Sequence, residues 1–422
     1  SHGFFDKRHP TMTEKIASIR RSTKKVDVAV VGCGPAGGLL AGRLARDGLD
    51  VIVLEKRPLV GVPVRCGEAA GSRDEISNFI PVDERWVTGD INAARMVAPD
   101  RTYVEKQLPG VGLMIRRDGF DQALADQAAN WGADVRTHHE VTGLIFEKKR
   151  VDGVRVHNHA TRTAYEIRAT VTVGSDGIES FVGRWANLTQ HLKPRQIHSG
   201  VEYILECDDF PRDTIELHLT ARYAPGGYAW VFPKGEGRAS VGLGIHPGKA
   251  KNGTAREYLD RFIRDRYPRA RAGKLVAGGI SGTKPLKTMV DEGVLLVGEA
   301  ARQNNPFSGG GIMNALEGAE EAHKVLRDAF SSGDTGKEFL RRYDKAWHDR
   351  NGYLIQRFAM LRELFFLLDD KQLNAVVKGL AQFVKARPGQ IIDYTEVFGT
   401  VFRMTPGVLW KAQKMLWPIR AD

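Results

Sequence analysis

The sequence predicts an α/β protein in three parts: a parallel-sheet domain, a mainly antiparallel sheet and a helical C-terminal region. Residues 26–55 show the pattern of a strand, a helix and a second strand, with glycines after the first strand. Residues 195–245 alternate apolar and polar positions between turn signals, which is typical of antiparallel strands. From residue 331 onward the apolar spacing is helical.

The elements of the first part follow in chain order. Apolar runs rich in β-branched residues predict buried strands over 26–31 and 50–55, and the spacing between them predicts a helix over 36–48. Residues 61–75 are rich in Gly and Pro and predict a loop. Later patterns indicate helices over 120–131 and 311–330, a strand at 134–136, antiparallel strands over 140–159 and 165–173, and a buried strand over 293–297.

The composition is that of a folded chain with a basic surplus. Hydrophobic residues make up 42% and charged residues 27% of the 422 positions, which permits a large core and excludes a disordered chain. The length predicts two or three domains. A formal net charge of +11 suits an anionic partner, whether nucleic acid, an acidic membrane surface or a phosphorylated substrate.

Cysteine usage and the N-terminal segment bear on location. Cys33, Cys66 and Cys207 form no CxxC pair, which favours a reducing, cytoplasmic setting. We expect no membrane-spanning segment, because no run of about 18 apolar residues occurs, and no signal peptide. Met12 is the expected native start, and residues 1–25 are treated as an N-terminal extension.

A glycine-rich loop between the first strand and the helix predicts a dinucleotide phosphate site. The motif GxGxxG comprises Gly32, Cys33, Gly34, Pro35, Ala36 and Gly37. Glycines let backbone N–H groups approach a pyrophosphate, and the helix N-terminus adds a partial positive charge. Glu55 ends the second strand, where a carboxylate can accept hydrogen bonds from ribose hydroxyls. The coincidence of motif, strand, helix and acid makes an ordinary turn a poor explanation.

Two later glycine–acid segments favour FAD over NAD. The run VGSDG places Asp176 and Gly177 directly after a predicted strand. Residues 297–311 place Glu299 after another strand and a glycine cluster at the start of a helix. Such acids can bind ribityl hydroxyls, and the glycine backbone can stabilise negative charge on a reduced flavin. Each segment alone could be an ordinary loop, but three around one sheet predict a long dinucleotide.

These motifs resemble those of a known group. The run GCGPAGG at 32–38, Arg117 ahead of Phe120 and Asp121, SDG at 175–177 and residues 297–311 are similar to the para-hydroxybenzoate hydroxylase-like flavoproteins. The segments PVRCGE at 63–68, APGGYAWVFPKG at 224–235 and VGLG at 241–244 resemble the FAD-dependent geranylgeranyl reductases, and most closely the archaeal digeranylgeranylglycerophospholipid reductases. The likeness covers nearly the whole chain from Val26.

The resemblance implies a domain organisation and a set of cofactor contacts. It implies a Rossmann-type FAD-binding domain in residues 26–75, 105–190 and 275–330, an antiparallel-sheet substrate domain in 76–104 and 191–274, and a helical region in 331–422. The implied cofactor contacts are Gly32, Gly34, Pro35, Ala36, Gly37, Glu55, Lys56, Arg65, Cys66, Gly67, Arg117, Asp176, Gly177, Glu299, Pro306, Gly309, Gly310, Gly311 and Ile312. Glu299 departs from the group, which usually has Asp there, so its carboxylate should be displaced.

The resemblance also implies an activity. A hydride from reduced flavin would saturate C=C bonds of geranylgeranyl chains in archaeal-type membrane ether-lipid precursors. Only one complete nucleotide loop is present, so electrons would come from transiently bound NAD(P)H or from a ferredoxin. A flavin monooxygenase or halogenase is the enzymatic alternative, although halogenases have Trp at the position of Tyr228. A membrane-peripheral electron-transfer flavoprotein is the non-catalytic alternative.

The candidate catalytic residues are Cys66, Tyr228 and Trp230. Cys66 is expected near the flavin, where a thiol with its usual pKa of about 8.5 could donate a proton; a small apolar filler is the alternative. Tyr228, Trp230 and Phe232 alternate on one predicted strand and should face one side. That side could wall an apolar cavity or form an ordinary aromatic core.

Surface partners and metals complete the expectations. Arg65 and Lys234 could meet an anionic lipid head, although solvated surface charge is the usual fate of a single cation. The apolar and basic stretches 354–368 and 401–417 either pack on the body or touch an anionic membrane, at the inner face of the cell membrane. No nucleic acid partner is expected. Paired histidines at 138–139 and at 157 and 159 lack further ligands, so no metal is expected.

Overall fold

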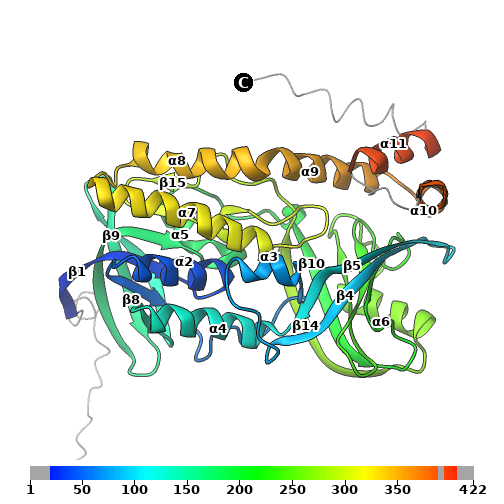
Figure 1. Ribbon diagram of the computed structural model, residues 1–422, viewed down its shortest axis with the longest axis horizontal. Helices are drawn as coiled ribbons and strands as arrows, with labels where there is room; N and C mark the ends of the chain where they lie inside the picture. Colours follow the sequence, from blue (N-terminus) through cyan, green and yellow to red (C-terminus); the bar gives the residue numbers. More distant parts are fainter. Residues whose placement is uncertain (1–19, 388–393, 406–422) are drawn as a thin grey trace, which may run out of the picture.

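Two eight-stranded sheets organise the chain, and helices cover them (Figure 1). The computed structural model describes residues 20–387 and 394–405. One hydrophobic core lies around the first sheet, a second lies between the second sheet and a helix, and a third lies under the C-terminal helices. The chain is therefore an α/β protein with separate cores for its two sheets.

The first sheet has the order β15-β16-β9-β1-β2-β6, with β8 pairing β9 and β7 pairing β8. Its strands are β1 (Arg20–Val31), β2 (Val51–Leu54), β6 (Asp134–Arg136), β7 (His139–Glu147), β8 (Arg150–Asn158), β9 (Thr163–Gly174), β15 (Val290–Asp291) and β16 (Val294–Leu296). Strands β16, β9, β1 and β2 are parallel. Residues 28–31 of β1, 51–54 of β2 and 294–296 of β16 are buried and apolar because helices pack on the sheet, as in other parallel sheets.

Three long helices pack on this sheet: α2 (Pro35–Arg46), α4 (Arg117–Asn130) and α7 (Ile312–Ser332). Helix α2 contacts both of the others. Gly38 and Gly42 allow the close approach to α4, because a Cβ at either position would lie 3.1 Å from an α4 or Trp131 side-chain atom. Shorter elements are α3 (Arg73–Ser77), α5 (Phe181–Trp185), η1 (Gly177–Glu179), η2 (Pro194–Gln196) and η3 (Gly298–Ala301).

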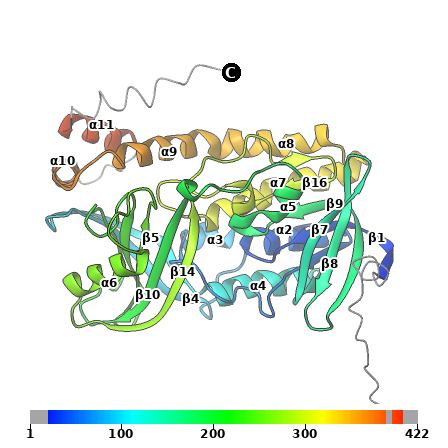
Figure 2. The same cartoon turned by 180° about the vertical axis from the view of Figure 1, so that it is seen from behind.

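The second sheet has the order β14-β10-β13-β12-β11-β4-β5-β3. Its strands are β3 (Ala69–Ala70), β4 (Val87–Val97), β5 (Tyr103–Ile115), β10 (Ile197–Glu206), β11 (Thr214–His218), β12 (Tyr228–Pro233), β13 (Arg238–Ile245) and β14 (Arg271–Ser281). All neighbours are antiparallel except β11 and β4. Helix α6 (Ala255–Arg266) packs on one face, next to β10 and β13 (Figure 2).

The C-terminal helices run along one side of both sheets (Figures 1 and 2). Helix α8 (Lys337–Trp347), the π-helical turn η4 (His348–Gly352) and α9 (Tyr353–Phe365) follow one another without a break, and α10 (Asp370–Ala386) and α11 (Tyr394–Met404) complete the region. Helix α8 contacts α7 and β15, whereas α10 contacts β5. This region therefore joins the two sheets. The end of the stretch 401–417 lies outside the described residues.

Most elements expected from the sequence are confirmed, but some differ and two strands were not expected. Strand β1 begins at Arg20 rather than at residue 26, and the loop expected over 61–75 contains β3 and the start of α3. Strands β4 and β5 were not expected, because the glycines, alanines and proline within them interrupt the apolar alternation. The second sheet consequently continues to Ile115 and Ser281, past the boundaries expected at residues 104 and 274.

Candidate functional site

A cavity of about 610 Å³ lies where the loops of the first sheet meet the second sheet. One side is lined by the GxGxxG loop, by the loop around Cys66 and by the glycine cluster 309–311. The other side is lined by strands of the second sheet. The cavity therefore brings the predicted nucleotide loop and the predicted aromatic wall into one space.

The register of the first sheet explains why the three glycine–acid segments meet. Val31 pairs with Leu54 and with Gly174, and Gly174 pairs with Leu296. The carboxyl ends of four parallel strands are thus level, and ligands bind at this edge in open α/β sheets. The segments expected to hold a dinucleotide continue directly from these strand ends.

The glycines of the GxGxxG loop have different structural roles. Gly32 has φ +95°, and a Cβ there would lie 2.6 Å from the carbonyl oxygen of Ser175. A Cβ on Gly37 would lie 2.1 Å from the carbonyl oxygen of Gly32. Gly34 lines the cavity, and a Cβ there would meet no protein atom within 4 Å. Gly32 and Gly37 therefore allow the chain to pack on itself, whereas Gly34 leaves its side of the backbone open to a ligand.

Glu55 holds the loop in shape. Its carboxylate accepts hydrogen bonds from the N–H of Cys33 and from the N–H of Arg57, both at 3.0 Å. The carboxylate is therefore fixed beside the phosphate loop. Lys56 next to it forms an ion pair with Glu179 at 3.6 Å.

Three polar side chains near the cavity carry unmet hydrogen-bonding capacity or a disfavoured charge. Burial raises the pKa of Asp176, whose Oδ2 accepts from the N–H of Val182 at 2.9 Å, while its buried Oδ1 has no partner among the described residues. Burial also raises the pKa of Glu299. Asn304, which the sequence did not single out, donates to the Ser281 carbonyl at 2.7 Å, and its buried Oδ1 has no partner in the described part of the chain.

Cys66 and Arg117 meet at the cavity. The Cys66 Sγ accepts a hydrogen bond from the N–H of Glu68 at 3.3 Å. Burial raises the pKa of the Cys66 thiol, and the nearby Arg117 guanidinium partly offsets this effect. Arg117 is itself held by two hydrogen bonds to Asp121, both 2.7 Å. The thiol is therefore protonated at neutral pH and faces the cavity.

Lys234 lies inside the protein rather than at an anionic surface. Its ammonium group donates to the carboxylate of Glu68 and to the Ile115 carbonyl, the latter at 3.0 Å. Both side chains of the Lys234–Glu68 pair are buried. The expectation that Lys234 meets a lipid head is wrong, because its charge is matched internally. Arg65 is exposed at the rim of the cavity, with its Cβ beside Gly278.

Of the two alternatives for the aromatic residues of β12, the structure supports the cavity wall. Tyr228, Trp230 and Phe232 all line the cavity from β12. The Tyr228 hydroxyl donates to the Ser308 carbonyl, which fixes its ring toward the glycine cluster. Trp230 lies over Gly242, where a Cβ would come within 2.4 Å of the indole.

Two polar residues beside Trp230, on the same face of the sheet, were missed by sequence reasoning. The Trp230 indole N–H donates to Ser240 Oγ at 3.2 Å, and Ser240 donates to Glu202 Oε2 at 2.6 Å. Glu202 lines the cavity, and burial raises its pKa to about 7. No sequence motif indicates these residues, because only the pairing register of the strands brings them together.

The far end of the cavity is apolar and is built largely by the unexpected strands. Its side chains are Ile91, Ala94, Leu108, Val111, Ile215 and Leu217. Val111 is exposed, which places it where the cavity meets solvent. The cavity therefore changes from a glycine-lined, polar end to an apolar end.

Most of the expected cofactor contacts line this cavity, and some do not. Those that line it are Gly34, Pro35, Ala36, Arg65, Cys66, Gly67, Arg117, Gly177, Glu299, Gly309, Gly310, Gly311 and Ile312. Gly32, Gly37, Glu55, Lys56, Asp176 and Pro306 are outside the lining. Contact of any of them with a cofactor stays a prediction.

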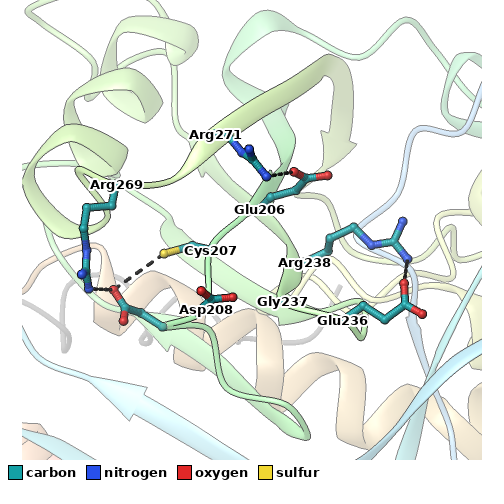
Figure 3. Close-up of a pocket in the computed structure, with 9 residues that line it drawn as sticks. Glu206, Cys207, Asp208, Glu236, Gly237, Arg238, Arg269 and Arg271 are labelled. Carbon is teal, nitrogen blue, oxygen red and sulfur yellow. Dashed lines mark hydrogen bonds and ion pairs between the residues drawn. The ribbon is translucent and has the colours of Figure 1, made fainter.

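A second pocket lies at the end of β10 and the starts of β13 and β14 (Figure 3). Three arginines there pair with carboxylates: Arg269 with Asp209, Arg271 with Glu206 and Arg238 with Glu236. The Cys207 thiol points toward Asp209 at 3.7 Å. This pocket shares no lining residue with the cavity, and each of its three arginines is paired with a carboxylate.

The chain is similar to proteins of one family. Residues 196–282, which span β10 to β14, match the model of the geranylgeranyl reductase catalytic domain. A digeranylgeranylglycerophospholipid reductase of Methanosarcina acetivorans is 36% identical over 403 residues, covering 93% of this chain and 95% of that protein. The crystal structure of a geranylgeranyl bacteriochlorophyll reductase-like protein from Thermoplasma acidophilum is 31% identical, with a TM-score of 0.84 over 94% of this chain and 100% of that one.

More distant structures share the fold alone. A flavin-dependent brominase superposes with a TM-score of 0.69 at 15% identity, covering 93% of this chain and 100% of that chain. The α/β fold expected from the sequence, that of the para-hydroxybenzoate hydroxylase-like flavoproteins, is therefore confirmed.

Proposed function

Because the chain belongs to the family of digeranylgeranylglycerophospholipid reductases, we propose that it is a flavin enzyme that saturates C=C bonds of geranylgeranyl chains in archaeal-type ether-lipid precursors. The observation that carries the proposal is the single cavity, which joins a dinucleotide loop to an apolar wall. A reductase of apolar chains needs its cofactor site and its apolar substrate site to share one cavity, because the reacting bond must reach the cofactor.

The residues present fit FAD as the cofactor. Gly34 offers an open backbone surface beside the N-terminus of α2, which suits a pyrophosphate. The unpartnered buried oxygens of Asp176 and Asn304 offer acceptors for hydroxyl or amide donors. Gly309, Gly310 and Gly311 precede α7 and would hold the pyrimidine edge of the ring. When bound and reduced, the flavin supplies the hydride.

The protein's own side chains would position the substrate and provide the proton. Tyr228, Trp230 and Phe232 give an apolar surface beside the glycine cluster. The Cys66 thiol, kept protonated by burial, lines the same cavity and could donate a proton to the second carbon of the bond. The apolar end between β4, β5 and β11 would hold the rest of the chain and exclude water.

The electron donor and the membrane are further parts of the proposal. Electrons would come from NAD(P)H bound transiently or from a ferredoxin, since the chain has one complete nucleotide loop. The enzyme would bind the inner face of the cell membrane peripherally, drawn by its net charge of +11. Within residues 20–387 and 394–405, no helix is long and apolar enough to cross a membrane.

The decisive experiment is anaerobic turnover. Protein reduced by dithionite is incubated with a digeranylgeranylglycerol phospholipid, and the lipid is examined by mass spectrometry for addition of H₂. Replacing dithionite with NADH, NADPH or reduced ferredoxin identifies the donor. Denaturation should release FAD, identified by chromatography. Oxygen or halogen insertion would support the monooxygenase or halogenase alternative, and reoxidation of the flavin without a lipid product would support electron transfer.

A further inference from the structure

One carboxyl group of the second sheet faces the proposed substrate cavity. Glu202 on β10 is directly opposite Gly242 on β13 and Val276 on β14, and Gly242 is opposite Trp230 on β12. Directly opposite residues project from the same face of a sheet. Glu202 therefore shares the cavity face with Trp230 and Val276, both of which line the cavity.

This carboxyl group has no cationic partner of its own. Ser240 Oγ donates to Glu202 Oε2 at 2.6 Å, and Ser240 in turn accepts the Trp230 indole N–H. The Glu202 side chain is 6% exposed, and within the described part of the chain no Lys or Arg forms an ion pair with it. A buried carboxylate with hydroxyl donors but no cation is costly to keep charged.

The charged groups around Glu202 favour its neutral form on balance. Burial raises the Glu202 pKa to about 7, Ser240 lowers it, the negative charge of Glu68 raises it, and Lys234 and Trp230 lower it. The Lys234 ammonium group forms its ion pair with Glu68. The loop at residues 63–68 also presents the Cys66 thiol to the cavity, and Arg65 of the same loop lies at the cavity rim. Strand β14 presents Val276, Gly278 and Ile280 to the cavity, none of which titrates, and Lys274, two residues before Val276, is exposed to solvent.

An entering isoprenoid chain would remove the remaining water from this surface. With Glu202 neutral, the wall from Val276 to Trp230 carries only one hydrogen-bonded carboxylic acid. With Glu202 ionised, the chain would have to cover an unpaired charge, and its binding would weaken.

From this placement, which rests on the proposed function, we infer that Glu202 is a specificity-determining residue of the substrate cavity. Its neutral carboxyl group completes a wall that accepts an apolar chain, and its ionisation makes the same wall reject that chain. Ser240 is the positioning residue that sets where the change occurs, because its hydrogen bond stabilises the carboxylate.

Binding to the oxidised holoenzyme tests this directly, since the oxidised enzyme cannot turn over. The dissociation constant of a geranylgeranyl ether lipid is measured by equilibrium dialysis between about pH 6 and about pH 8.5. Wild type should bind progressively more weakly above about pH 7, by up to about tenfold per pH unit. Glu202→Gln, which resembles the neutral acid, should bind at every pH as wild type does at low pH. Ser240→Ala should move the midpoint to higher pH, whereas a merely structural role would leave it unchanged.

An independent readout follows the carboxyl group itself. The C=O stretch of a protonated carboxylic acid in the infrared spectrum should disappear near pH 7 in wild type and be absent from Glu202→Gln. If the enzyme reduces the lipid but wild type and Glu202→Gln have the same dissociation constant at every pH, this inference is overturned. The reductase proposal would then still stand. Absence of both lipid binding and lipid reduction at every pH would overturn both.

Discussion

Lys234 and Glu68 form a buried ion pair across 166 positions of sequence. Glu68 also accepts the N–H of Arg117 at 2.6 Å, so one carboxylate ties together the loop at 63–68, the end of β12 and the start of α4. The loop carries Cys66, and β12 carries the aromatic wall. The pair therefore fixes the thiol relative to the wall.

Breaking this pair should destabilise the protein strongly. Lys234→Met leaves the Glu68 carboxylate buried without its cation, and loss of one partner of a buried pair typically costs about 3–5 kcal/mol. The free energy of unfolding is measured in urea at neutral pH. The double variant Glu68→Gln with Lys234→Met should recover part of the loss, because no unpaired charge remains. Equal stability of Lys234→Met and wild type would show that the pair is not formed in solution.

Gly34 and Gly37 offer a matched test of the nucleotide loop. Gly34→Val should abolish flavin retention while leaving the melting temperature of the flavin-free protein nearly unchanged, because a side chain there meets only the cavity. Gly37→Val should lower that melting temperature itself, since its Cβ would collide with the Gly32 carbonyl. Absorbance of the bound flavin and circular dichroism separate the two effects. A Gly34→Val protein that still holds FAD would place the pyrophosphate elsewhere.

The elements that were predictable from sequence depend on local pattern. The strand, glycine loop and helix from residue 26 to 46 follow from neighbouring residues, and the three glycine–acid segments each follow a short buried strand. That they would meet could be expected, because carboxyl ends of parallel strands share one edge.

The missed features depend on pairing between distant residues. Strands β4 and β5 lack clear alternation and are held by partners, β11 and β3, that no local pattern reveals. Glu202 and Ser240 become a site only through the register that places β13 between β10 and β12. Lys234 looked like a surface cation, and only the fold brings Glu68 to it.

Cys66 and Trp230 should matter for turnover more than for the cofactor. Cys66→Ser nearly keeps the size of the side chain but replaces the thiol with a much weaker acid, so single-turnover lipid reduction should fall by about 100-fold or more if the thiol donates the proton. Trp230→Ala should also retain FAD but lose lipid reduction, because it removes the wall over Gly242. Stopped-flow flavin reoxidation by lipid measures both. Wild-type rates in Cys66→Ser would reduce Cys66 to a space-filling residue.

The stability of the protein should depend on pH through Glu202. Its pKa is about 7 in the folded chain and 4.5 ordinarily, so between these values the folded state binds more protons than the unfolded state. Stability then falls as pH rises through this window, by up to about 3 kcal/mol. Glu202→Gln lacks this contribution, so the difference between the variant and wild type should grow from about pH 4.5 to about pH 7 and level off above it. If wild type and Glu202→Gln differ in free energy of unfolding by the same amount at every pH, Glu202 is not a buried carboxyl group that titrates in this range.

Peripheral membrane binding should depend on charge and on the C-terminal region. A geranylgeranyl lipid leaves a bilayer reluctantly, since each CH₂ transferred to water costs about 0.8 kcal/mol. Docking on the membrane avoids that transfer, and each well-placed cation contributes about 1 kcal/mol at an anionic surface. Helix α9 buries Leu361, Leu364 and Phe365 against the body, whereas Leu354 near its start is exposed.

The other candidate for insertion is the end of the chain, of which residues 406–422 lie outside the described part. A truncation after Thr405 is preferable to one before Val401, because Val401 is buried against α10 and its removal would disturb the fold. The protein should sediment with anionic liposomes, less with neutral ones and less again at high salt. The truncated protein should lose more liposome binding than flavin. If full-length protein fails to bind anionic vesicles at low salt, the positive surplus serves solubility and the lipid must reach the cavity from a carrier or a micelle.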